Sequence, residues 1–264
     1  MSRRFKLALA QCAHPEDGDV LAMADSWADR AQAAGADMLA FPECLMTPYE
    51  KEPEEFAASA QTLDGDFSRG MDAMARRHGL WIVYTVNELN LDGGRPYNTA
   101  VVTGSDGIKR ARYRKVHLFD AGDYRESSKM SAGDSIFEPT DTPFCRLGLG
   151  ICYDLRFPEL ALKQALSGCE LIVYPAAWVA GEGKVGQWQT LLRARAIENG
   201  MFVAGLCRVG SNCIGNSLVV GPAGETVARA GDGEELLLCE IDPEEVASTR
   251  RKMPSLQHRR PDLY

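Results

Sequence analysis

Strand-like and helix-like segments alternate along two parts of this chain, one at its start and one in its second half. The first part consists of strands 5–11, 37–41 and 80–86, with helices 20–34 and 66–78 between them. The second part consists of strands 144–151, 170–174 and 201–207, with helices 157–167 and 185–199 between them. Such alternation is typical of sheets whose outer faces are covered by helices. The chain is therefore predicted to fold as α/β (α+β), with mixed sheets.

Antiparallel pairing is expected between these two parts and after the second. Strands 97–102 and 107–113 flank Ser105-Asp106-Gly107, and the Asp-Gly step is a strong hairpin signal. Strands 213–220 and 235–241 follow later, with a Gly-Pro-Ala-Gly turn at 221–224 between them and a polar, basic tail after them. No repeat or linker composition divides the chain, so residues 1–264 are predicted to form a single domain.

The polar connection 120–141 shows no clear period. Connections of this length in compact domains are usually functional or mobile.

Composition excludes several classes of partner. A net charge of −8 and 25% charged residues, without a basic and aromatic cluster, argue against nucleic acid and an anionic membrane. No segment approaches the ~20 apolar residues of a membrane span, and the apolar run near the N-terminus stops at Gln11, too early for a signal peptide. The eight cysteines form no CxxC pair and are expected to be reduced, mostly buried residues. These features predict a cytoplasmic protein.

Cys152 lies where the predicted strand 144–151 ends and a helix is about to begin. A tight strand-to-helix turn exposes the side chain and brings backbone N–H groups near it, as in the nucleophile elbows of acyl-transfer enzymes. For Cys152 alone, the competing interpretation is a buried small residue.

Two further strand ends carry charged side chains. Glu43 follows Phe41-Pro42, and Lys115 lies in Tyr113-Arg114-Lys115-Val116-His117. Because ligand sites in open α/β sheets gather at the carboxyl ends of strands, the acid, the cation and the thiol are expected to share one site.

The three blocks together resemble the carbon–nitrogen hydrolase (nitrilase-like) family, whose members carry Glu, Lys and Cys in this order. The resemblance covers essentially the whole chain. It implies the four-layer α-β-β-α sandwich of the nitrilase-like type. It also implies a homodimer or higher homo-oligomer, built through helices 157–167 and 185–199, with segment 253–264 reaching the partner.

The resemblance implies a role for each catalytic side chain. Cys152 would attack an amide and release ammonia, Glu43 would be the general base, and Lys115 with the backbone N–H of Tyr153 would stabilise the oxyanion. The family uses a second glutamate, for which Glu126 is the candidate. Glu138 lies nearby as an alternative, and a solvated loop carboxylate remains possible. His117 is expected to be structural.

The neighbourhood of the cysteine resembles amidases more than nitrilases. Cys152-Tyr153-Asp154 favours amides, and runs 148–160 and 173–178 resemble ω-amidases and deaminated-glutathione amidases. The implied substrate is a small-molecule ω-amide of a carboxylate. Arg156 is the candidate for binding that carboxylate, although it could instead pair with Asp154 or Glu159.

The predicted substrate pocket also contains Tyr49, Tyr153, Trp178 and Lys184. Trp178 stands where ω-amidases are expected to have phenylalanine. The substrate alternatives are an N-carbamoyl amine or amino acid and a simple aliphatic amide.

Other classes of function remain open as alternatives. A binding or scaffold protein of the same fold would not need the intact Glu43, Lys115 and Cys152. A redox protein would need a resolving thiol close to Cys152, and the nearest in sequence, Cys145, lies across one strand. The four histidines lack zinc-site spacing, and the third glycine of a nucleotide-binding loop is missing. No metal and no cofactor are expected.

Overall fold

The computed structural model describes residues 4–15, 18–210 and 212–263. Two six-stranded sheets form its centre. The first has the order β12 (Glu235–Ile241), β1 (Phe5–Gln11), β2 (Met38–Ala40), β3 (Trp81–Glu88), β4 (Tyr97–Thr103) and β5 (Lys109–Arg114). The second has the order β11 (Thr226–Arg229), β10 (Leu218–Val220), β9 (Phe202–Cys207), β8 (Leu171–Ala176), β7 (Arg146–Leu149) and β6 (Thr140–Asp141).

The two sheets are built alike. In each sheet three neighbouring strands run parallel, β1-β2-β3 in the first and β7-β8-β9 in the second. Every remaining strand pairs antiparallel with its neighbours. Parallel strands must be connected by crossovers, which the helices supply. The predicted mixed sheets are confirmed.

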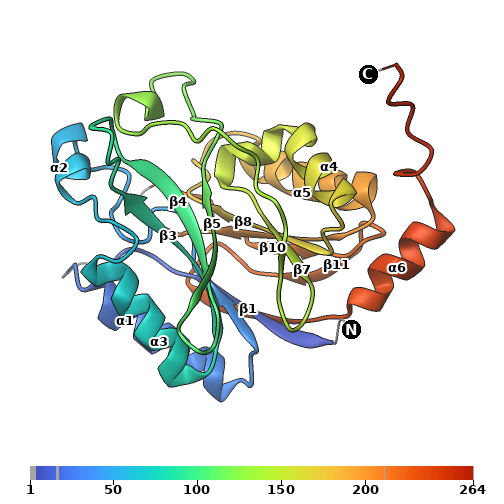
Figure 1. The fold of residues 1–264 in the computed structure, drawn as a ribbon, viewed down its shortest axis with the longest axis horizontal. Coiled ribbons are helices and arrows are strands. Elements are labelled where there is room, and N and C mark those ends of the chain that lie inside the picture. Colours follow the sequence, from blue (N-terminus) through green and yellow to red (C-terminus); the bar gives the residue numbers. More distant parts are fainter. Residues whose placement is uncertain (1–3, 16–17, 211, 264) are drawn as a thin grey trace.

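Helices cover the outer face of each sheet. α1 (Val20–Ala33) and α3 (Asp66–His78) pack together over the first sheet, and α4 (Pro158–Leu166) and α5 (Lys184–Asn199) over the second (Figure 1). The four-layer α-β-β-α sandwich predicted from the sequence is therefore confirmed. Two further helices, α2 (Pro53–Ala58) and α6 (Pro243–Lys252), lie outside these layers.

The alternation of side chains along β1 shows how the layers are held together. Leu7 and Leu9 are fully buried in the cluster between the sheets, whereas Ala8 and Ala10 are fully buried in the cluster beneath α1 and α3. Successive side chains of a strand point to opposite faces. Burial on both faces explains why Leu7 to Ala10 are all apolar instead of alternating with polar residues.

Several elements differ from the sequence prediction. The strand predicted at 213–220 is reduced to β10, because Gly215 and Asn216 have positive φ angles of 57° and 53° and cannot continue an extended backbone. The predicted polar tail begins with helix α6 instead. Helix α2 and strand β11 were not predicted, and the turn at 221–224 leads into β11.

Two sequence predictions extend beyond the described residues. The interpretation of the N-terminus includes residues 1–3, and the segment expected to reach a partner includes Tyr264, all of which lie outside the described residues. Among the helices that the structure describes, none is both long enough and apolar enough to span a membrane.

Candidate active site

Lys115 lies at the centre of a buried cluster of charges. It follows β5 directly, and its side chain is 2% exposed. Its Nζ lies 2.9 Å from Glu43 Oε1 and 2.8 Å from both carboxylate oxygens of Glu126. Glu43 comes from the end of β2 and Glu126 from the short helix η1 (Glu126–Ser128), so one ammonium joins segments that are far apart in sequence.

Three hydrogen-bond donors hold the Glu43 carboxylate. Besides Lys115, Asn98 Nδ2 donates to Oε1 at 2.8 Å and the Ala177 N–H donates to Oε2 at 2.8 Å. The thiol of Cys152 lies near enough for the Glu43 carboxylate to raise its pKa. A carboxylate bound in this way is fixed in position and faces the sulfur, as a general base must.

Glu126 is held by a second donor besides Lys115. The Phe119 N–H donates to its Oε2 at 2.6 Å, the oxygen that also accepts from Lys115 at 2.8 Å. Its side chain is 2% exposed, whereas Glu138, the alternative from the sequence, is exposed and lines a different surface depression beside β5. The structure therefore brings Glu126 into the cluster and leaves Glu138 outside it.

Cys152 begins the short helix η2 (Cys152–Arg156), three residues after β7 ends. Its φ of 46° lies in the left-handed region, which non-glycine residues seldom adopt. Such a strained turn from strand to helix matches the elbow predicted from the sequence.

Asp154 stabilises this turn. It is fully buried, and its carboxylate accepts hydrogen bonds from the Ile151 N–H at 2.9 Å and the Tyr113 hydroxyl at 2.8 Å. The Nδ1 of His117 lies 2.8 Å from the same carboxylate, and the His117 ring stacks on Phe157 at 3.6 Å. His117 therefore contacts residues of the turn, and this fits the structural role expected for it.

The thiol of Cys152 stays protonated at neutral pH. Burial raises its pKa well above the ordinary value for cysteine, and the charge of Glu43 raises it further against the opposing effect of Lys115. For Lys115 itself, burial lowers the pKa, but Glu126 and Glu43 outweigh it and the net direction is upward, so the ammonium persists. The resting site therefore combines a neutral thiol with a charged lysine.

A cavity of about 290 Å³ opens in front of the sulfur. Its lining includes four of the residues predicted for the substrate pocket, which are Tyr153, Arg156, Trp178 and Lys184, together with Cys152. Tyr49 lines an adjoining cavity that also contains Glu43, Lys115, Glu126 and Cys152. The two cavities meet at the thiol, so all of these side chains surround one site.

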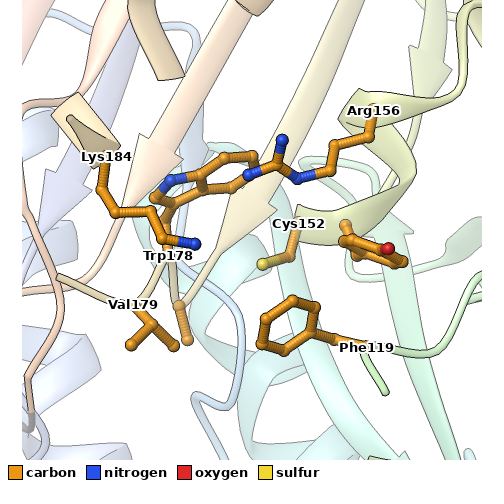
Figure 2. Close-up of a pocket in the computed structure, with 8 residues that line it drawn as sticks. Phe119, Cys152, Arg156, Trp178, Val179 and Lys184 are labelled. Atoms are coloured by element: carbon orange, nitrogen blue, oxygen red, sulfur yellow. The ribbon is translucent and has the colours of Figure 1, made fainter. Parts of the chain in front are cut away.

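Two cations face this cavity. Figure 2 shows the Lys184 side chain extending toward Cys152 and the Arg156 guanidinium lying against the Trp178 ring, at 4.7 Å from its centre. Arg156 also donates to Gln187 Oε1 at 2.8 Å. Within the described part of the chain it forms no ion pair with Asp154 or Glu159, the partners considered from the sequence.

Several residues of the site escaped sequence analysis. Asn98 and Ala177 bind the Glu43 carboxylate, and Phe119 both holds Glu126 and lines the cavity. A backbone N–H carries no signal of its own in a sequence, and an asparagine within a strand reads as an ordinary polar residue. Within the described ranges, no group of three or more His, Cys, Asp or Glu side chains is placed to hold a metal ion.

Comparison with known families identifies this arrangement. Residues 6–251 match the family model described as carbon-nitrogen hydrolase. Among curated proteins, the chain is 36% identical to omega-amidase NIT2 of Homo sapiens over 272 residues, which cover 98% of this chain and 96% of the relative.

Solved structures show the same fold. Saccharomyces cerevisiae Nit3, a member of branch 10 of the nitrilase superfamily, superposes with a TM-score of 0.87 and is 31% identical, with 100% of this chain and 98% of that chain covered. A variant of the amidase from Nesterenkonia sp. AN1 gives a TM-score of 0.82 and is 29% identical, with 98% of both chains covered. In that structure acrylamide has added to the active-site cysteine.

Proposed function

Because the chain belongs to the carbon–nitrogen hydrolase family and is an amidase, we propose that it hydrolyses ω-amides of small carboxylates, with Cys152 as the nucleophile. The observation that carries the proposal is the cavity of about 290 Å³, which has the thiol together with Arg156 and Lys184 on its lining. When its amide carbon lies at the sulfur, a short substrate would have its carboxylate within reach of Arg156 and Lys184. Guanidinium groups bind carboxylates through two parallel hydrogen bonds.

The first half of the reaction uses the contact between the thiol and Glu43. Glu43 accepts the thiol proton as sulfur bonds to the amide carbon, and the carbonyl oxygen becomes an oxyanion. Lys115 and the Tyr153 N–H stabilise that oxyanion. The C–N bond then breaks as Glu43 passes its proton to the nitrogen, and ammonia leaves a thioester on Cys152.

The second half regenerates the enzyme. A water molecule gives a proton to Glu43 while its oxygen bonds to the thioester carbon. The C–S bond then breaks, the acid is released, and the proton returns to the sulfur. Glu126 keeps Lys115 in place throughout, through its two contacts at 2.8 Å.

The charge balance favours this internal proton transfer over prior ionisation of the thiol. Lys115 offsets only one of the two carboxylates beside it, so a proton lost from Cys152 to bulk water would add a further buried negative charge. Transfer to Glu43 moves the negative charge without adding to it. The raised pKa of Cys152, caused first by burial and then by Glu43, agrees with this.

The test is ammonia release from a matched panel of substrates. The panel contains succinamate-like and 2-oxo-dicarboxylate ω-amides, N-carbamoyl amino acids, neutral aliphatic amides and nitriles, each with wild type, Cys152→Ala and Arg156→Gln. We expect wild type to prefer ω-amides, Cys152→Ala to be inactive on every compound, and Arg156→Gln to lose at least about tenfold in kcat/KM on carboxylate-bearing amides alone.

Other outcomes would redirect the proposal. A preference for carbamoyl compounds or neutral amides would leave the cysteine mechanism in place with a different pocket. Turnover by Cys152→Ala would exclude the mechanism. If wild type releases no ammonia from any compound of the panel, the binding-protein alternative would be favoured.

The oligomer and the compartment belong to the same proposal. A homodimer through α4 and α5 is supported by Leu166 and Ile197, large apolar side chains that are 51% and 56% exposed on these helices. A cytoplasmic location is supported by the cysteines, because none among the described residues forms a disulfide.

A further inference from the structure

Arg208 is a buried cation outside the catalytic cluster described above. It follows β9 directly and is 2% exposed. Within the described part of the chain its guanidinium forms no ion pair, and Nη1 is buried without a hydrogen-bond partner. Burying a charge is costly unless an opposite charge compensates it. Arg208 therefore requires a compensating anion.

The guanidinium lines a second, small cavity of about 180 Å³. Of the described carboxylates, only Glu43 lines this cavity with Arg208. Glu43 also lines the adjoining cavity that contains Lys115 and Cys152. Glu43 therefore belongs to the lining of both cavities, one of which it shares with the nucleophile and the other with Arg208.

A count of buried charges leads to the same carboxylate. With both carboxylates ionised, Glu43 and Glu126 carry two negative charges, and Lys115 offsets one of them. Burial raises the pKa of Glu126 and Lys115 opposes the rise, so a further positive charge nearby would favour the ionised pair. The positive charge of Arg208 brings the buried set to neutrality. In an interior of low effective dielectric, charges interact over a longer range than they do in water, so direct contact is not needed.

We propose that Arg208 is a positioning residue for Glu43, because its positive charge compensates the buried carboxylate that accepts the thiol proton. The inference rests on the proposed function, because it assigns Glu43 the role of general base. Arg208 is not among the residues that line the two cavities at the thiol, so it acts through Glu43.

The pKa values of two neighbouring thiols depend on the charges of both Glu43 and Arg208. Burial raises the pKa of Cys44 most, Glu43 raises it further, and Arg208 opposes the rise. Burial likewise raises the pKa of Cys213 to about 12, with Arg208 opposing and Glu43 adding to the rise. Each of the two thiols therefore lies in the electric field of both Glu43 and Arg208.

The other titratable groups around Arg208 do not account for a change in activity at low pH. Burial lowers the pKa of His14 and raises that of Cys12 to about 12, so both are neutral near pH 7. Glu50 and Glu234 act on this region from exposed positions, where solvent screens them. On the other side of Glu43 lie Lys115, Glu126 and Cys152, which belong to the cluster itself.

The experiment measures kcat/KM against pH for Arg208→Gln, Arg208→Lys and a control, Arg250→Gln. Without the positive charge of Arg208, the anionic form of the cluster is less well compensated. We therefore expect the acid limb of the profile to move upward by about one pH unit in Arg208→Gln, with up to about tenfold lower kcat/KM at pH values well below the wild-type limb and little loss on the plateau. Arg208→Lys should retain the wild-type limb because it retains the charge.

Arg250 provides the matched control. It is also largely buried, but its guanidinium donates to the carbonyl oxygens of Cys169 and Asn199, far along the sheet from Glu43. Arg250→Gln should change stability without moving the acid limb. An equal loss at every pH in Arg208→Gln, or an unchanged limb, would overturn the inference.

A stability cycle covers the case in which Arg208→Gln folds poorly. If Arg208 compensates Glu43, then Arg208→Gln should lower Tm by less than half as much in a Glu43→Gln background as in wild type. An equal loss in the two backgrounds would refute the pairing. Turnover retained by Glu43→Gln would instead show that Glu43 is not the general base of the proposed function, and this keeps the two failures apart.

Discussion

At the scale of single residues, Glu43 should have opposite effects on turnover and on thiol reactivity. Glu43→Gln removes the general base, so we expect turnover to fall by about 10²- to 10⁴-fold. After burial, the charge of Glu43 is the largest factor that raises the pKa of Cys152, so its removal should make the thiol more acidic. Alkylation of Cys152 by iodoacetamide at pH 7.5, followed by mass spectrometry, should become at least about threefold faster.

Glu138→Gln is the control for this experiment. Glu138 lies in the connection 120–141, where it is exposed, and it does not line the cavity. It should leave both rates unchanged. Slower alkylation in Glu43→Gln would mean that Glu43 promotes ionisation of the resting thiol, contrary to the mechanism above.

Lys115 should matter for stability as much as for catalysis. Lys115→Met leaves two buried carboxylates unpaired, which should lower the free energy of unfolding by about 3–5 kcal/mol and abolish turnover. Adding Glu126→Gln removes one of the uncompensated charges, so the double variant should regain about half of that loss while staying inactive. Urea unfolding measures both. A double variant whose loss equals the sum of the two single losses would contradict this account of the cluster.

The site also shows what a sequence reveals about single residues. Glu43, Lys115 and Cys152 could be predicted because each follows a recognisable strand and carries reactive chemistry. Asn98 and the Ala177 N–H bind Glu43 through groups that every protein contains many times. Arg208 follows a strand too, but only the three-dimensional structure shows that it is buried and lines a cavity together with Glu43.

At the scale of secondary-structure elements, the turn that carries Cys152 depends on a glycine. A Cβ built on Gly150 would lie 2.3 Å from the Tyr174 ring, which cannot give way easily because Tyr174 is fully buried in β8. Gly150→Ala should therefore displace the turn, destabilise the protein by about 1–3 kcal/mol and lower kcat. Thermal unfolding and ammonia release measure the two effects.

Gly186→Ala is the corresponding control within helix α5. A Cβ there meets nothing within 4 Å, and alanine is favoured over glycine in a helix by about 1 kcal/mol. This substitution should raise Tm and leave turnover unchanged. Equal stability of the two alanine variants would show that the ring of Tyr174 does not constrain the turn.

Among the elements, the predictions succeeded where a periodic apolar pattern coincided with burial. Helix α3 has the predicted bounds, with Met71 and Met74 buried at helical spacing. Strand β11 was missed because it is only four residues long and none of them is buried. Helix α6 was missed because it is largely polar, although Asp242 followed by Pro243 and two acidic residues is an N-terminal helix signal.

At the scale of the whole molecule, the active site exists because two sheets face each other. Glu43 and Lys115 follow strands of the first sheet, whereas Cys152 follows a strand of the second. The hydrogen bond between Glu43 and the Ala177 N–H joins the two sheets directly. Small shifts of one sheet against the other would separate base and nucleophile, so packing between the sheets and catalysis should be coupled.

The outer layer of α4 and α5 leads to the last prediction, which concerns the oligomer. Leu166 and Ile197 expose apolar surface on these two helices, which pack against each other, and the segment after α6 extends away from the body of the protein (Figure 1). We expect wild type to sediment as a dimer at micromolar concentration, and Leu166→Glu/Ile197→Glu to sediment as a monomer because burying two carboxylates at the interface is costly. Leu91→Glu, at an 81% exposed position in the turn after β3, should remain a dimer. A wild-type monomer, or a double variant that still sediments as a dimer, would place the interface elsewhere or exclude it.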